Sequence, residues 1–240
     1  MNFLSRDNTK KALAFVKTGE TVSCARPVVF EPTVDAAGPA VHYMVESGEG
    51  WATGDKVTSR VTQAATDYIG MVFHGFTVTH VDSLAHFFWK GQMYNGRPAH
   101  LVSTNLGATS ESIEVAGEGI MSKGVLVDVP RLRGLEWLER GEGVMPEDIL
   151  EAEQRYGFCI DEGDVLLIRT GQLHRRGVEG PVDFRSEGST ACHAACLPLF
   201  HDRKIAMLGT DTGNDIIPAP YPSVIQPIHQ VGIVAMGLGF

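Results

Sequence analysis

The stretch Asp164-Val165-Leu166-Leu167-Ile168-Arg169 is a short apolar run bounded by turn residues, and it decides the fold class. Two similar runs flank it in the sequence, GVLVDV at residues 124–129 and IAMLG at residues 205–209. Runs of this length and composition are typical of strands in the interior of a sheet. The three runs therefore predict a sheet of buried strands.

A helix is predicted between the first two strands, at residues 145–157 (MPEDILEAEQRYG). Pro146 suits a first helical turn, Glu147 and Asp148 suit the positive end of the helix dipole, and Gly157 suits the C-terminal stop. A helix between two strands places the chain in the α/β class, and we expect one mixed α/β domain.

Three further segments have patterns of their own. The first 20 residues show the period of a short amphipathic helix, and residues 190–200 (TACHAACLPLF) also predict a helix. Residues 68–82 are dense in β-branched and aromatic side chains, which predicts one or two strands that lead into the loop that follows. Residues 175–189 (RRGVEGPVDFRSEGS) are expected to be a long surface loop that could cover a functional site.

Charge and hydropathy exclude some classes of partner. The 240-residue chain has a formal net charge of −9, and its basic residues are scattered apart from short clusters such as residues 174–176, so nucleic acid is not expected as a partner. No apolar run approaches the roughly 20 residues that span a bilayer. The charged N-terminus lacks the apolar segment of a signal peptide, so we expect a soluble, cytoplasmic protein.

The four cysteines lack the spacing of a zinc or redox motif. Cys24, Cys159, Cys192 and Cys196 are expected to be small, reduced core side chains. A metal clip formed by Cys192, His193 and Cys196 is the alternative, although small and apolar residues around it favour packing.

The segment around residues 73–89 carries the chemistry. If His80 to Asp82 is extended, the two side chains point to the same face, because side chains alternate along a strand. An imidazole and a carboxylate that converge in this way suit a divalent cation such as zinc or manganese. His86 could return over the site from a loop. The alternative is that these are satisfied core or surface histidines, but four of the nine histidines fall within residues 65–100, where unpaired polar groups are costly.

The segment THVDSLAH, residues 79–86, resembles part of a family motif, H-x-G-T-H-x-D-x-P-x-H, found in the cyclase-like metal-dependent hydrolases. This family includes bacterial kynurenine formamidase, isatin hydrolase and proteins described as cyclases. The chain is similar to its longer members from about residue 50 to the end, through GQMYNG (91–96), GDVLLIRTG (163–171), LGTD (208–211) and PIH (227–229). The resemblance implies a single cyclase-like domain of the swivelling β/α/β type over residues 1–240.

The resemblance also implies roles for individual residues. His80 corresponds to a metal ligand, Asp82 to a residue that ligates or bridges metal, and His86 to the general acid/base. His229 is similar to the late metal-binding histidine of the family. The implied cofactor is a divalent metal, zinc or manganese.

The chain departs from the motif at its first histidine, where it has Phe76, and Val78 and Leu84 replace the motif's glycine and proline. His74 is the candidate replacement ligand. Because six extended residues span roughly 20 Å, His74 can reach His80 only through a bulge or turn near Gly75. A hydrogen-bonding or substrate role for His74 remains open.

A second departure concerns the end of the sequence. In the family a carboxylate ligand follows the late histidine, whereas this sequence ends at Phe240, eleven residues after His229. Residues 236–240 are apolar and have no polar tail. We therefore expect a longer natural chain that supplies an acid shortly after Phe240.

The reaction implied is hydrolysis of an amide, lactam or ester by metal-activated water, because a bound divalent cation lowers the pKa of water and polarises a carbonyl. A histidine suits the accompanying proton transfer. Aromatic residues around the motif could stack on an N-formylarylamine or a fused lactam such as isatin, although most of them could equally be core. We select Phe76, Trp89 and Tyr94 as the candidate substrate contacts.

Two other functions stay open. A catalytically silent binding protein of the same fold would explain Phe76 and the missing late acid. A cyclase or dehydratase that acts on a polyketide-like chain would differ only in whether water is consumed. The resemblance also implies a homodimer or homotetramer that takes a small-molecule substrate.

Overall fold

A computed structural model of the chain describes residues 2–36, 38–52 and 62–240. The chain divides into two compact units. The larger consists of Met1–Val22 and Val81–Phe240, and the smaller consists of Ser23–His80.

A three-stranded parallel sheet lies at the centre of the larger unit. Its strands are β5 (Gly124–Asp128), β7 (Val165–Arg169) and β9 (Met207–Thr210), in the order β5-β7-β9. All three strands were predicted, and their bounds agree with the prediction to within two residues. The prediction that both faces of each strand are buried was wrong for β5. Leu126 is 59% exposed, between the buried Val125 and Val127, because β5 is an edge strand of this sheet.

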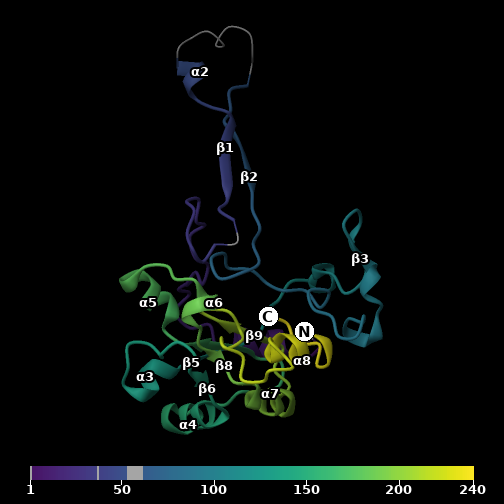
Figure 1. The fold of residues 1–240 in the computed structure, drawn as a ribbon, viewed down its shortest axis with the longest axis vertical. Coiled ribbons are helices and arrows are strands. Elements are labelled where there is room, and N and C mark those ends of the chain that lie inside the picture. Colours follow the sequence, from purple (N-terminus) through teal and green to yellow (C-terminus); the bar gives the residue numbers. More distant parts are fainter. Residues whose placement is uncertain (1, 37, 53–61) are drawn as a thin grey trace. The chain divides into compact units, whose positions relative to one another are not determined.

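The helices of the larger unit connect and flank these strands (Figure 1). α4 packs on α3, and α7 packs on α8. The α-helices of this unit are α1 (Arg6–Leu13), α3 (Val129–Arg133), α4 (Pro146–Tyr156), α5 (Gln172–Glu179), α6 (Phe184–Glu187), α7 (Leu197–Arg203) and α8 (Pro227–Val234). The short 3-10 helices are η1 (Tyr94–Gly96), η2 (Ala99–Leu101), η3 (Ile113–Ala116) and η4 (Ala194–Cys196). The remaining strand pairs are β3 (Val102–Ser103) with β4 (Gly107–Ala108) and β6 (Gly143–Val144) with β8 (Ala191–Cys192).

The predicted helix at residues 145–157 is confirmed as α4. Pro146 occupies its first turn, and the side chain of Asp148 accepts a hydrogen bond from the backbone N–H of Met145 at 2.7 Å. The helix ends at Gly157, whose φ of 67° lies in the left-handed region that glycine adopts without strain. The N-terminal helix is also confirmed, as α1, which Ser5 caps.

The helix predicted over residues 190–200 was wrong in its first half. Ala191 and Cys192 form the strand β8, which pairs in parallel with β6, and α7 begins only at Leu197. Ala191 and Cys192 form a strand here because Gly143 and Val144 supply its pairing partner.

The long surface loop predicted at residues 175–189 was also wrong. Most of this segment is helical, because α5 continues to Glu179 and α6 covers Phe184–Glu187. The side chain of Asp183 caps α6 by accepting a hydrogen bond from the N–H of Arg185 at 3.0 Å. Only the residues around Gly180 connect the two helices.

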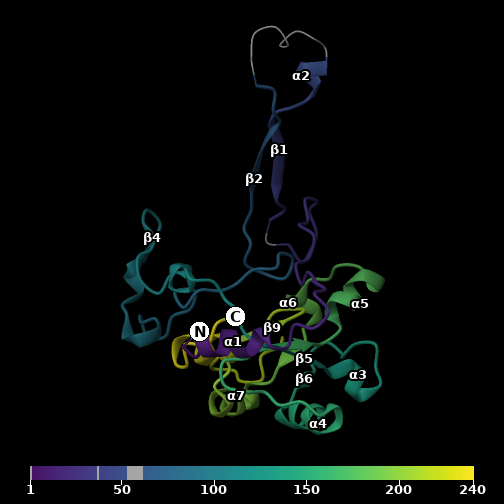
Figure 2. The ribbon, with the colours of Figure 1, turned by 180° about the vertical axis from the view of Figure 1, so that it is seen from behind.

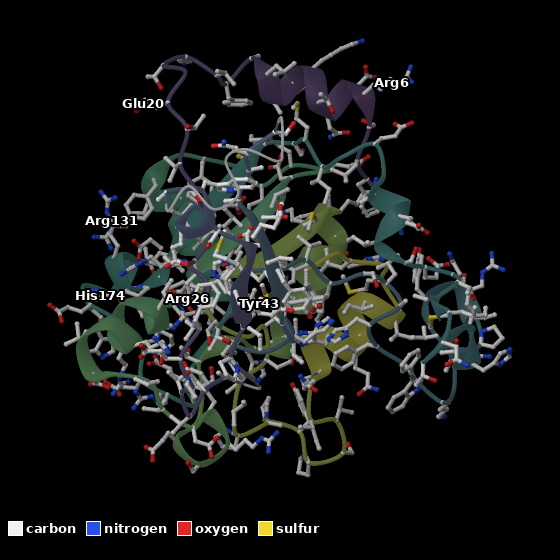
Figure 3. All side chains as sticks on the ribbon, turned by 90° about the horizontal axis from the view of Figure 1, so that it is seen from above. Arg6, Glu20, Arg26, Tyr43, Arg131 and His174 are labelled. Atoms are coloured by element: carbon white, nitrogen blue, oxygen red, sulfur yellow. The ribbon has the colours of Figure 1, made fainter. Side chains whose placement is uncertain are left out.

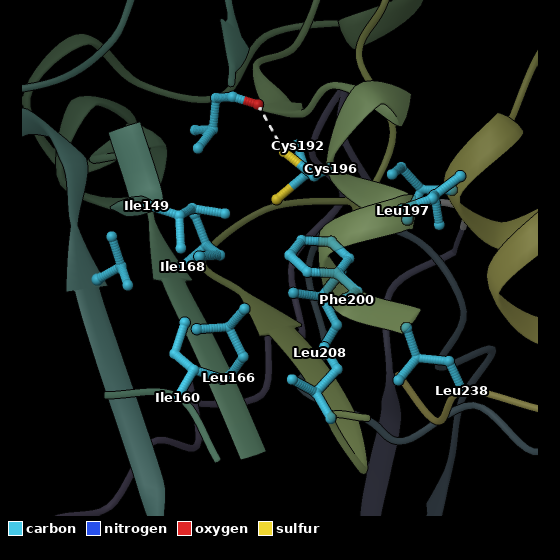
Figure 4. Packing of buried hydrophobic residues seen from close by; sticks show 14 of the residues in the cluster. Ile149, Ile160, Leu166, Ile168, Cys192, Cys196, Leu197, Phe200, Leu208 and Leu238 are labelled. Atoms are coloured by element: carbon cyan, nitrogen blue, oxygen red, sulfur yellow. Dashed lines mark hydrogen bonds between the residues drawn. The ribbon is translucent and has the colours of Figure 1, made fainter. Parts of the chain in front are cut away.

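The hydrophobic core of the larger unit lies between the sheet and its helices (Figure 4). Leu166 and Ile168 of β7 are at most 1% exposed, and so is Phe200 of α7. Leu208 of β9 and Ile149 of α4 belong to the same cluster and are labelled in Figure 4. Burial of these apolar side chains makes the main favourable contribution to the free energy of packing β7 and β9 against α4 and α7.

The smaller unit contains an antiparallel hairpin, which both views show as two strands side by side (Figures 1 and 2). β1 (Val41–Glu46) pairs with β2 (Thr66–Gly70), and the short helix α2 (Glu49–Ala52) follows β1. The strand prediction for residues 68–82 holds only as far as Gly70. Residues 71–82 form no regular strand, so the extended arrangement considered for His80 to Asp82 is not part of a sheet.

The cysteine prediction is half confirmed. All four cysteines are free, but only Cys192 and Cys196 are buried, whereas Cys24 and Cys159 are exposed. A hydrogen bond with Cys196 and burial raise the pKa of the Cys192 thiol well above its ordinary value. A thiol of this kind stays protonated and is a poor metal ligand. Within the described residues, no group of three potential ligands includes either cysteine, so the metal clip was wrong.

Exposed basic side chains are spread over separate elements. Arg131 on α3 and His174 on α5 are both exposed, and they belong to different helices (Figure 3). In the described part of the chain, no helix combines the length and the apolar character needed to cross a bilayer.

Candidate active site

In the larger unit, a buried carboxylate faces two imidazoles. Asp82 is only 5% exposed. Its Oδ1 lies 3.8 Å from Nε2 of His86, and its Oδ2 lies 3.8 Å from Nε2 of His229. These separations are too long for direct hydrogen bonds. The structure therefore brings together three of the residues predicted from the sequence.

Each of the three is positioned by its backbone. The N–H of Asp82 donates to the carbonyl of Phe240 at 2.8 Å, which joins the motif to the end of the described chain. The N–H of His86 donates to the carbonyl of Ser83 at 3.1 Å, so a tight turn brings this histidine back toward Asp82. His229 lies in the first turn of α8, which begins at Pro227.

Aromatic rings pack around His229. The ring of Phe87 stacks on it with centroids 4.8 Å apart, and the ring of Phe240 meets it edge-on at 5.2 Å. The side chain of His229 is 11% exposed, while that of His86 is 28% exposed. His86 is therefore the histidine of this pair that solvent or a small molecule reaches more easily.

A fourth residue, which the sequence reasoning missed, belongs to this cluster. Asp215 is 5% exposed and hydrogen bonds to Nδ1 of His229. Its carboxylate also accepts from the backbone N–H of Ile228 at 2.7 Å and of His229 at 3.2 Å. No local pattern in the sequence marks this contact, because the partners are 14 positions apart and meet only when α8 folds back.

In the smaller unit, two histidines form a pair. The rings of His74 and His80 have centroids 5.2 Å apart, and potential ligand atoms of the two lie within 4.8 Å of each other. Nδ1 of His80 donates to the carbonyl of Val78 at 2.6 Å, so in the neutral ring Nε2 carries the lone pair. Gly75 has a φ of 122°, and the chain bends over residues 75–78. The turn required to bring His74 to His80 is therefore confirmed.

Arg26 holds this turn in place. Its backbone N–H donates to Oγ1 of Thr79 at 2.9 Å, and its guanidinium donates to the carbonyl of Phe76 at 3.0 Å. Phe76 thus contributes a backbone acceptor, and its side chain is half-buried. The two contacts span the segment between the paired histidines and restrict its conformations.

Sequence connectivity links the two groups of residues. His80 is the last residue of the smaller unit, and Asp82 follows it after the single residue Val81. The candidate ligands therefore come from one continuous segment, together with α8.

The other two predicted substrate contacts are Trp89 and Tyr94. Trp89 is 45% exposed, and the ammonium group of Lys90 lies 5.9 Å from its ring centre. The hydroxyl of Tyr94 accepts a hydrogen bond from Asn2 at 2.6 Å. Tyr94 also lines a cavity of about 260 Å³ beside Gly237, beyond the C-terminal end of α8, whereas His229 lies in the first turn of that helix.

Comparison with known proteins identifies the family. The sequence profile of the family described as "Putative cyclase" matches residues 23–214. A solved structure described as a novel cyclase is 26% identical to this chain and superposes with a TM-score of 0.83, covering 99% of this chain and 79% of the other. No curated protein matches the sequence.

Two isatin hydrolases share the fold at lower identity. Isatin hydrolase A from Labrenzia aggregata is 20% identical and has a TM-score of 0.58, covering 92% of this chain and 76% of its own. The enzyme of the same name from Ralstonia solanacearum is 16% identical and has a TM-score of 0.57, with 86% and 70% covered. These likenesses confirm the predicted cyclase-like α/β fold. The family profile matches most of this chain, residues 23–214. This chain therefore belongs to the "Putative cyclase" family.

Proposed function

We propose that this protein is a metal-dependent hydrolase that cleaves an amide, lactam or ester bond. The observation that carries the proposal is the buried carboxylate of Asp82 between the imidazoles of His86 and His229. A buried carboxylate is costly unless a cation or hydrogen-bond donors compensate its charge. In the sequence, His74 and His80 precede Asp82, and imidazole nitrogens of this kind are ligands that zinc binds.

The residues fit a divalent cation. Nε2 of His229 and Oδ2 of Asp82 are 3.8 Å apart. Zinc binds imidazole nitrogen and carboxylate oxygen at about 2.0–2.2 Å, so one cation can contact both atoms at this separation. We assign His74, His80, Asp82 and His229 as the residues that would hold zinc or manganese, a donor set of nitrogen and oxygen that suits either metal.

The bound metal would polarise the scissile carbonyl and lower the pKa of water toward neutrality. The protein's own residues supply the remaining chemistry. His86, the more exposed histidine, is assigned as the general acid/base that takes a proton from water and returns it to the leaving nitrogen or oxygen. Oδ1 of Asp82 lies 3.8 Å from its Nε2, so this general acid/base would stand beside a proposed metal ligand.

The proposed substrates are aryl amides and fused lactams, as for a kynurenine formamidase-like enzyme. The half-buried ring of Phe87 beside His229 supports this choice, since aromatic side chains stack on flat acyl groups. The shared fold with isatin hydrolases is consistent with a lactam. Trp89, Phe76 and Tyr94 remain proposed substrate contacts.

Metal analysis of the purified protein, followed by a substrate screen, tests the proposal. We expect near-stoichiometric zinc or manganese, and turnover of an N-formylarylamine, a lactam or a lactone that stops when the metal is chelated and returns on its addition. The His86→Ala variant should keep the metal and lose most of the turnover. Protein that binds neither metal would instead support the silent binding protein. Metal-dependent conversion without consumption of water would support a cyclase.

A further inference from the structure

Asp215 makes three contacts with the beginning of α8. Its Oδ1 accepts from the N–H of Ile228, and its Oδ2 accepts from the N–H of His229. Oδ2 also contacts Nδ1 of the His229 ring. A carboxylate has only acceptor oxygens when it is ionised, so the ring nitrogen that it contacts must carry the hydrogen.

We infer that Asp215 is a positioning residue that fixes the tautomer of His229. With the proton held on Nδ1, the lone pair of the neutral ring is on Nε2, the nitrogen that lies 3.8 Å from Asp82. The relevance of this tautomer to metal binding rests on the proposed function. Carboxylate partners of this kind orient ligating histidines and strengthen metal binding in many metalloproteins.

Replacement of Asp215 by asparagine would separate this role from a purely structural one. Asparagine has one acceptor oxygen and one amide donor, and it must still face two backbone N–H donors that cannot change direction. The contact with Ile228 is the shorter of the two, at 2.7 Å against 3.2 Å, so the amide oxygen should take that position. The NH₂ group then faces Nδ1 of His229, which must become the acceptor, and the ring proton moves to Nε2.

The test is the nitrogen chemical shifts of His229 in the metal-free, full 240-residue protein, measured by NMR with ¹⁵N-labelled histidine at a pH where imidazole is neutral. The wild type should show hydrogen on Nδ1 and a bare Nε2, and Asp215→Asn should show the reverse. Hydrogen on Nε2 or on both nitrogens in the wild type, or an unchanged tautomer in Asp215→Asn, would overturn the inference.

Asp211→Asn is a matched control. Asp211 also accepts three hydrogen bonds, from the N–H and hydroxyl of Thr170 and from the N–H of Gly171, but it holds the start of α5 instead of α8. This variant should lose stability and leave the His229 tautomer unchanged. A change of tautomer in Asp211→Asn would show that the effect is a general loosening of the fold, and would overturn the role of Asp215.

Titration with zinc alone provides the second measurement. We expect Asp215→Asn to bind zinc about 10–100-fold more weakly than the wild type, the range found for partners of metal ligands. Equal zinc affinity in the two proteins would refute the contribution of Asp215 to the site. If the wild type itself bound no zinc, the proposed function would fail, while the tautomer measurement would still decide the role of Asp215.

Discussion

At the residue scale, the burial of Asp82 sets the requirements of the site. Its carboxylate is 5% exposed and lies 3.8 Å from each of two imidazoles, a combination of oxygen and nitrogen ligands that suits a divalent cation. We predict that Asp82→Ala and His80→Ala each lower metal affinity roughly tenfold or more and abolish turnover. Loss of a metal ligand should weaken binding at least as much as loss of a residue that hydrogen bonds to a ligand, which costs roughly 10–100-fold. Metal content by elemental analysis and metal titration measure this loss.

His100→Ala is the control for these variants. His100 is exposed on η2 and belongs to the same histidine-rich segment, but it lies outside the proposed ligand set. It should keep wild-type metal content and turnover. Full metal content in both Asp82→Ala and His80→Ala would show that the metal binds elsewhere or not at all.

Gly75 carries a separate prediction. Its φ of 122° lies in a region that alanine adopts only with strain, although a methyl group there would meet no neighbouring atom. Strain of this kind costs about 1–3 kcal/mol, so Gly75→Ala should change the turn that pairs His74 with His80 and weaken metal binding.

Metal titration of Gly75→Ala is best compared with Gly48→Ala. Gly48 also has open space around it but does not have a positive φ, so its alanine variant should bind metal as the wild type does. If both variants kept wild-type affinity, the pairing of His74 with His80 would not contribute to the site.

How much of the site the sequence could predict depends on separation along the chain. His80, Asp82 and His86 lie within one turn-rich segment, so their spacing alone indicates that they are close. His229 was identified only through the family resemblance. The contact between Asp215 and His229 forms through the tertiary fold, and no periodicity could indicate it.

At the scale of elements, β9 is held mainly by its buried side chains. Leu208 is fully buried in the core cluster, whereas Leu106 is 77% exposed. We predict that Leu208→Ala lowers the free energy of unfolding by about 2–5 kcal/mol because it leaves a cavity. Leu106→Ala should change it by less than about 0.5 kcal/mol. Denaturant titration of both variants checks this, and similar midpoints would contradict the assignment of Leu208 to the core.

The accuracy of the predicted elements follows from the range of the interactions that stabilise them. α4 was predicted to within one residue because its proline, acidic first turn and terminal glycine are all local signals. Residues 190–192 were assigned wrongly because their strand depends on pairing with Gly143 and Val144, which are distant in sequence. The helices of residues 175–187 were missed because their glycines and Pro181 are typical of loops.

At the scale of the whole molecule, we predict a homodimer or homotetramer. A two-stranded hairpin is marginally stable by itself, and the hairpin of β1 and β2 exposes Tyr43, Val45 and Ile69. Contact with a second copy would cover such apolar side chains. Light scattering at working concentration measures the mass directly, and a monomer would contradict the prediction.

The hydrogen bond from the N–H of Asp82 to the carbonyl of Phe240 has a consequence for the order of folding. The same region also lies beside β9, because the N–H of Leu208 donates to the carbonyl of Gly239 at 2.9 Å. During synthesis neither bond can form until residues 239 and 240 have left the ribosome. The helix α4 and its local contacts can form much earlier, since local structure forms faster than pairing between distant segments. Refolding should therefore show helical signal before metal-binding competence, with the site among the last parts of the molecule to form.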